Sequence, residues 1–187
     1  MGPAVVTHSF SGGKNLENKL KELADGAAKS ALVRVGFLEG TTYPGTGTSV
    51  PMIAAIQEFG APAKGIPPRP YFRSMIKKES PHWGKDVAAL MKAYKFNTVT
   101  ALTAMGTEIK EELEQSITNL TDPPLSPVTL LLRERFGNQP HEIKFADVQK
   151  AREDIASGVT PNVTGTQAHP LIWTGVLQSK IDFEVES

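Results

Sequence analysis

The best candidates for metal or phosphate chemistry in this sequence are incomplete motifs. His141 and Glu142 begin the His-Glu-x-x-His sequence of zinc proteases, but the second histidine is replaced by Phe145. The Gly-Thr-Gly sequence at 45–47 lies where a phosphate could bind, but the dinucleotide pattern needs a glycine at position 50, which is Val50. The Gly-Lys-Ser/Thr ending of a phosphate loop is also missing. We therefore expect a flexible turn at 45–47, and neither a metal nor a cofactor.

Catalytic groups are equally hard to assemble from the sequence. The chain has no cysteine, and no serine lies in a Gly-x-Ser-x-Gly sequence. Several glutamates fall close together on one expected helix, at Glu108, Glu111, Glu112 and Glu114. Their spacing suits a solvated helix face and not a pair of carboxylates across a cleft. The expectation is a protein that is not an enzyme.

A stiff segment carries the residue types that dominate protein interfaces. Residues 61–70 contain four prolines, which fix backbone angles and keep the chain extended. Two arginines flank two aromatics between Arg69 and Arg73, and both residue types bury large areas with little loss of rotamer freedom. We predict a protein-interface surface here. Its candidate residues are Phe59, Pro67, Pro68, Arg69, Pro70, Tyr71, Phe72 and Arg73.

Two alternatives stay open for the same segment. Arginines and aromatics can also stack nucleic-acid bases, through Arg69, Tyr71, Phe72 and Arg73. Alternatively, Tyr71 and Phe72 anchor the turn in the chain's own core and the arginines are merely solvated.

Periodic apolar residues predict the elements that must position this segment. Helical spacing indicates helices at about 15–29, 49–59, 71–78, 81–94, 97–120, 128–136 and 145–156. Ser80 and Pro81 predict either a kink or a restart between the third and fourth of these. Alternating apolar residues predict strands at 31–38 and 177–185. Gly106 in the middle of the longest helix predicts a close approach by another element.

These elements predict an α+β fold. A small mixed or antiparallel sheet of the two strands packs against the long amphipathic helix at 97–120, with shorter helices and long loops around it. Residues 1–13 are expected to be a flexible arm. Residues 14–187 form a single domain, with a helical and irregular excursion at about 137–169.

Composition limits the partners. The 187 residues contain 20 Lys and Arg and 20 Asp and Glu, so nucleic acid or an anionic membrane is not expected as a whole-surface partner. No apolar run approaches the roughly 20 residues of a membrane-spanning helix, so we expect a soluble chain. A hydrophobic fraction of 40% is enough for a packed core.

Several short motifs, in order along the chain, resemble the neck and minor-tail (tail-completion) components of long-tailed bacteriophages. They span about 14–185. The motifs are Val33-Arg-Val-Gly-Phe-Leu-Glu-Gly40, Tyr43-Pro44, Ala54-Ala-Ile-Gln-Glu-Phe-Gly60, Ile66-Pro-Pro-Arg-Pro-Tyr-Phe-Arg73, Pro124-Leu-Ser-Pro-Val-Thr-Leu130 with Arg133, and the ending from Pro170 to Val185. The region 136–168 looks longer than the short loop expected in that family. This difference bears on which ring or partner the chain serves, and not on the resemblance to the family.

The resemblance implies a structural virion protein at the head–tail junction, present in the virion and, during assembly, in the host cytoplasm. It implies a homo-oligomeric ring, with six copies as one arrangement. Partners would be tail-tube, tail-terminator, tape-measure or head-connector proteins, with genomic DNA passing through the lumen without specific binding and no membrane. A tail terminator that caps the tube is the alternative within the class. A nucleic-acid-binding accessory protein is the alternative outside it.

Overall fold

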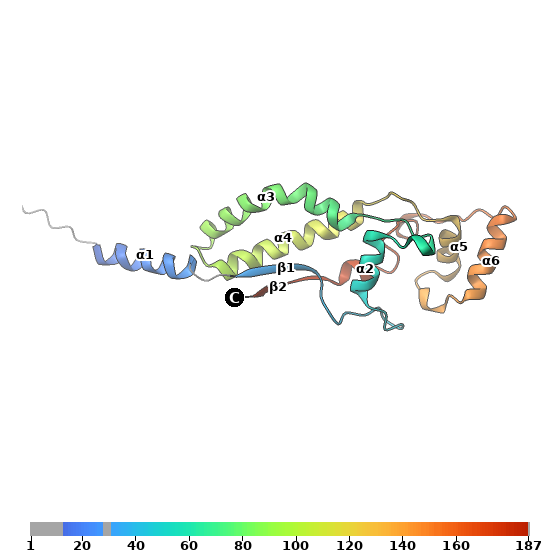
Figure 1. Ribbon diagram of the computed structural model, residues 1–187, viewed down its shortest axis with the longest axis horizontal. Coiled ribbons are helices and arrows are strands. Elements are labelled where there is room, and N and C mark those ends of the chain that lie inside the picture. Colours follow the sequence, from blue (N-terminus) through green and yellow to red (C-terminus); the bar gives the residue numbers. More distant parts are fainter. Residues whose placement is uncertain (1–12, 28–30, 187) are drawn as a thin grey trace, which may run out of the picture.

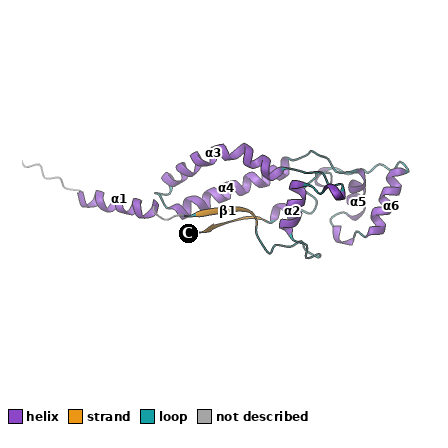
Figure 2. Cartoon of the chain, in the orientation of Figure 1, coloured by secondary structure: helices purple, strands orange, loops and turns teal. Residues whose placement is uncertain are grey.

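The computed structural model describes residues 13–27 and 31–186 (Figure 1). Helices dominate, and the strands form one small sheet (Figure 2). The elements are α1 (Gly13–Ala27), β1 (Leu32–Phe37), α2 (Val50–Phe59), α3 (Tyr71–Ala93), α4 (Thr98–Asn119), α5 (Pro127–Phe136), α6 (Phe145–Ala156), α7 (Val176–Ser179) and β2 (Ile181–Glu186). The expected arm at 1–13 lies outside the described residues except for Gly13, which begins α1.

The body of the molecule has three layers. β1 and β2 pair antiparallel, in a register that runs from Leu32 opposite Glu186 to Phe37 opposite Ile181. α4 packs against both strands, and α3 covers the other side of α4 (Figure 1). The α+β fold class is therefore confirmed, and the sheet is the antiparallel option.

The core lies along the inward face of α4. Its stripe is buried together with the first residues of α2, α3 and β2, and the fully buried large side chains are Tyr71, Met105, Leu113, Ile117, Ile181 and Val50. Gly106 lies where Phe183 of β2 crosses the helix. A Cβ at Gly106 would come within 2.5 Å of Phe183 Cδ2. The predicted close approach is confirmed, and its partner is a strand.

Some predicted boundaries are wrong. α3 is one helix that continues through Pro81, so of the two alternatives at Ser80 and Pro81, a kink or a restart, the restart does not occur. The last strand begins at Ile181, because Val176–Ser179 form the short helix α7 instead. Backbone hydrogen bonds close the glycine-rich turn before α2, with Tyr43 N donating to Thr48 O at 2.8 Å.

α5 and α6 pack on each other around a second apolar cluster of Leu131, Leu132 and Ala151. Arg133 connects this helical pair to the segment before α7. Its guanidinium donates to four backbone carbonyls, those of Gln167, His169, Pro170 and Ile172, and stacks 5.0 Å from the centre of the Trp173 ring. Burial lowers the pKa of Arg133 to about 10, with a smaller contribution from the charge of Arg69, so the group is still charged at neutral pH.

Among the helices described, none has the length and apolar character needed to cross a membrane.

Candidate functional site

The segment of residues 60–73, called here the proline turn, has an inner side and an outer side. Arg69 belongs to the inner side, since it is only 5% exposed. Its Nε and one terminal nitrogen donate to the carbonyls of Pro123 and Pro124 at 3.2 and 3.3 Å, and the other terminal nitrogen donates to Gln57 Oε1 at 3.2 Å. Burial lowers the pKa of Arg69. Arg69 therefore fastens the turn to the chain entering α5, and it is not the solvated arginine of the core-anchor alternative.

Tyr71 is also interior, at 1% exposed. Its hydroxyl donates to Ala54 O at 3.1 Å, and its ring meets Phe37 edge to face at 6.4 Å. Burial, reinforced by the charge of Glu58, raises the pKa of the Tyr71 hydroxyl. Tyr71 thus anchors the turn in the core, which is the role that the core-anchor alternative gave it.

Glu58 holds the turn in place and was missed from the sequence. It is buried in the last turn of α2, and its carboxylate accepts from the backbone N of Phe72 and of Arg73 at 2.9 and 3.2 Å. A carboxylate at a helix N-terminus satisfies unpaired N–H groups and is favoured by the helix dipole. The available signal was spacing, because Val50, Ala54 and Glu58 lie on one helix face and the first two are apolar.

The outer side of the turn is formed by Arg73 together with Phe59, the residue just before the turn. Arg73 Nε donates to Glu58 Oε1 at 2.7 Å, which aligns the guanidinium 4.9 Å from the centre of the Phe59 ring. Phe59 remains 62% exposed. This pair gives the surface a fixed aromatic and cationic corner, and rigid groups of these types are those that interfaces use.

Gly60 allows the turn to fold back on itself. Its φ is +76°, and a Cβ there would lie 2.8 Å from both Ile66 O and Pro68 N. Only glycine accepts this close backbone approach without strain. Pro67 and Pro68 are consequently presented on the exposed side of the turn.

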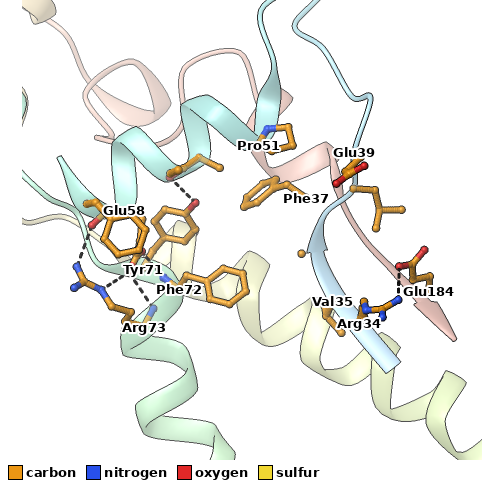
Figure 3. Close-up of a pocket in the computed structure, with 15 residues that line it drawn as sticks. Arg34, Val35, Phe37, Glu39, Pro51, Glu58, Tyr71, Phe72, Arg73 and Glu184 are labelled. Atoms are coloured by element: carbon orange, nitrogen blue, oxygen red, sulfur yellow. Dashed lines mark hydrogen bonds and ion pairs between the residues drawn. The ribbon is translucent and has the colours of Figure 1, made fainter. Parts of the chain in front are cut away.

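Phe72 lies between the two sides and lines an open groove with a cavity volume of about 830 Å³, called here the β1–α2 groove (Figure 3). β1 forms one wall, and α2 with the start of α3 forms the other. Most of the lining residues are apolar, and the charged ones are Arg34, Glu39, Glu58, Arg73 and Glu184. The residues are Arg34, Val35, Gly36, Phe37, Leu38, Glu39, Pro51, Ala54, Ala55, Glu58, Phe59, Tyr71, Phe72, Arg73 and Glu184.

The other candidates do not converge on a chemical centre. His141 lies beside the glycine-rich turn, with its Cγ 3.8 Å from where a Cβ of Gly45 would stand. Glu112 accepts a hydrogen bond from Trp83 Nε1 at 2.9 Å and faces α3. Within residues 13–27 and 31–186, no three His, Cys, Asp or Glu residues are grouped closely enough to hold a metal ion.

Comparison of the sequence with protein-family models, with curated proteins and with solved structures found no match.

Proposed function

We propose that this chain is a structural virion protein of a tailed bacteriophage, a neck or tail-completion component that acts as a ring at the head–tail junction. The observation that carries the proposal is the way in which the motif residues fit together. Glu58 caps α3, Gly60 permits the fold-back, and Phe59 stacks on Arg73 at the surface. The motifs that resemble the phage family thus form a rigid exposed corner beside an apolar groove.

The shape and charge of the chain are compatible with a ring. Identical copies close into a ring when one patch docks on a different patch of the next copy. The β1–α2 groove and its proline-turn margin supply one such patch. Equal numbers of basic and acidic residues, 20 of each, suit a component stacked between other proteins around a DNA passage. The proposed neighbours are tail-tube, tail-terminator, tape-measure or head-connector proteins.

Deletion of the gene from its phage tests the proposal. We expect capsids and tails to be made but not joined, whereas a tail-terminator role would give tails with defective ends. Mass spectrometry of purified virions should detect the protein at several copies per particle. Normal infectious particles that form without the protein would contradict the proposal.

Part of the surface that the nucleic-acid-binding alternative requires is buried. Of its four residues, Arg69 and Tyr71 are interior, which leaves Phe72 and Arg73. We expect no salt-dependent DNA binding by the purified chain at physiological ionic strength. Binding that weakens with salt, and that Arg73→Ala removes, would favour the accessory-protein function instead.

A further inference from the structure

α1 is an amphipathic helix whose apolar face is uncovered. Its stripe is formed by Leu16, Leu20 and Leu23, and the first two are 63% and 57% exposed. The helix projects from one end of the body (Figure 1). It is tied there by Thr98 Oγ1, which donates to Gly26 O at 2.8 Å. Isolated helices of about 15 residues are marginal in water, so α1 needs a partner for its leucines.

The β1–α2 groove is the complementary surface. The groove is lined by small residues from both elements, Gly36 of β1 and Ala55 of α2. The larger apolar side chains of Phe37 and Phe72 also line it (Figure 3). The volume of about 830 Å³ is open to solvent along the groove. A groove of this kind fits the apolar side chains of an amphipathic helix. α1 lies at the end of the molecule and the groove lies beside α2 in its middle.

We infer that α1 of one copy docks its leucine stripe in the β1–α2 groove of the next copy. The inference rests on the proposed ring and names the contact that would build it. Each copy offers its helix to one neighbour and its groove to the other, so the contact is heterologous and continues until the ring closes. Phe59 is exposed and lines the groove, so its ring contacts the docked helix.

The size of the contact explains why closure matters. A 15-residue helix is about 22 Å long and 10 Å wide, which is a small footprint beside the about 800 Å² per partner of a stable pair. One helix–groove contact is therefore weak. In a closed ring every copy is held on both sides, and the second contact forms at high effective concentration. The isolated chain should be monomeric when dilute and assemble when concentrated or when placed on the tail.

Pairing of α1 with α1 is the main rival. Leu16, Leu20 and Leu23 have the 4-3 spacing of a coiled-coil seam. The helix spans only about two heptads, whereas a sustained coiled coil needs about three or four.

Disulfide cross-linking tests the contact cleanly because the chain has no cysteine. Two single variants, Leu20→Cys and Ala55→Cys, are mixed at high concentration and oxidised. We expect the mixed dimer at least tenfold above the yield for Leu20→Cys with Lys85→Cys, a matched control at an exposed position on α3. Equal yields with the control, no cross-link, or a dominant dimer of Leu20→Cys with itself would overturn the inference.

A double variant that carries both cysteines separates ring contact from simple pairing. Oxidation should give a ladder of multimers, since each copy links to two others. Adding Leu16→Asp should reduce the ladder at least tenfold, and Lys21→Asp on the opposite helix face should leave it unchanged. Leu16 is exposed, so Leu16→Asp should keep the thermal midpoint of the monomer; a ladder unaffected by Leu16→Asp would overturn the inference.

The two proposals fail in different ways. If the cross-linked ladder forms but virions do not contain the protein, the helix–groove contact is supported and the proposed phage function is contradicted. If virions contain the protein but the cross-link does not form, the proposed function is supported and the helix–groove contact is contradicted.

Discussion

α1 and α4 have the same sequence pattern and opposite surroundings. Both are amphipathic helices with large apolar residues at spacings of three and four. The stripe of α4 is buried between α3 and the sheet, whereas that of α1 faces solvent. The large buried side chains of α4 are Met105, Ile109, Leu113 and Ile117. Apolar periodicity therefore identifies the helix face that must be buried, but it does not say whether the burying partner belongs to the same chain.

The polar faces of the two helices differ in the same way. Glu22 of α1 is in solvent, and the hydrogen bond and charge of Lys19, 2.7 Å away, lower its pKa. Glu112 of α4 faces α3 beside Trp83, and burial raises its pKa. The pKa of the same residue type is thus shifted in opposite directions, upward by burial against α3 at Glu112 and downward by a neighbouring lysine on an uncovered helix at Glu22.

The largest expected effect comes from truncating one leucine in each helix. Leu113→Ala removes a side chain that is fully buried, and the lost contacts and the cavity should cost about 2–5 kcal/mol of unfolding free energy. Leu20→Ala should change the unfolding free energy of the dilute monomer by only about 0.5 kcal/mol or less, because this side chain is exposed. Urea denaturation of both variants measures the difference. Comparable losses would show that α1 is covered in the monomer.

A smaller effect is expected from alanine at two helical glycines. At Gly106 the new methyl group overlaps the ring of Phe183, so overpacking should cost about 1–3 kcal/mol. At Gly84 of α3 nothing lies within 4 Å of the new Cβ, and the gain in helix propensity should stabilise the chain by up to about 1 kcal/mol. Thermal unfolding should therefore shift in opposite directions. A stabilising Gly106→Ala would mean that β2 does not approach α4 this closely.

Patterns with a strong local cause were predictable from the sequence. The α4 helix, the two strands and the capping by Ser49, Asn97 and Ser126 follow from periodicity and from side chains that accept hydrogen bonds from the first helical turn. The antiparallel pairing of the strands is a property of the fold that the sequence left open. At Pro81 the sequence left a kink and a restart open, because the packing of α3 on α4, which holds the helix together where local preference alone would break it, is not visible in the local sequence.

The division of the proline turn into two sides was not predictable. Arg69 and Arg73 are the same residue type in one short segment, and composition gives both to the surface. Their positions depend on long-range partners. Arg69 is buried because it donates hydrogen bonds to the carbonyls of Pro123 and Pro124, whereas Arg73 stays at the surface and donates to Glu58. Such acceptors are known only when the chain is folded.

The smallest effect, and the most direct comparison of the helices, is the pH dependence of Glu112 and Glu22. Because folding raises the pKa of Glu112, its contribution to stability is full below the unfolded value of about 4.5 and is lost as pH rises through the folded pKa. Glu112→Gln avoids that loss and can still accept from Trp83, so it should be more stable than the parent near pH 7, by about 2 °C or less in Tm, and the difference should vanish toward pH 4.

Glu22 should show the opposite sign. Folding lowers its pKa, so its contribution is present above about 4.5 and is lost as pH falls through the folded value. Glu22→Gln should therefore be slightly less stable than the parent near pH 7 and equal to it at acidic pH. Thermal melts from pH 4 to 7 on both variants, with NMR titration of the two carboxyl groups, measure the signs. If Glu112 titrated below Glu22, α3 would not cover α4 at this point, and the contrast between the covered and uncovered helix would fail there.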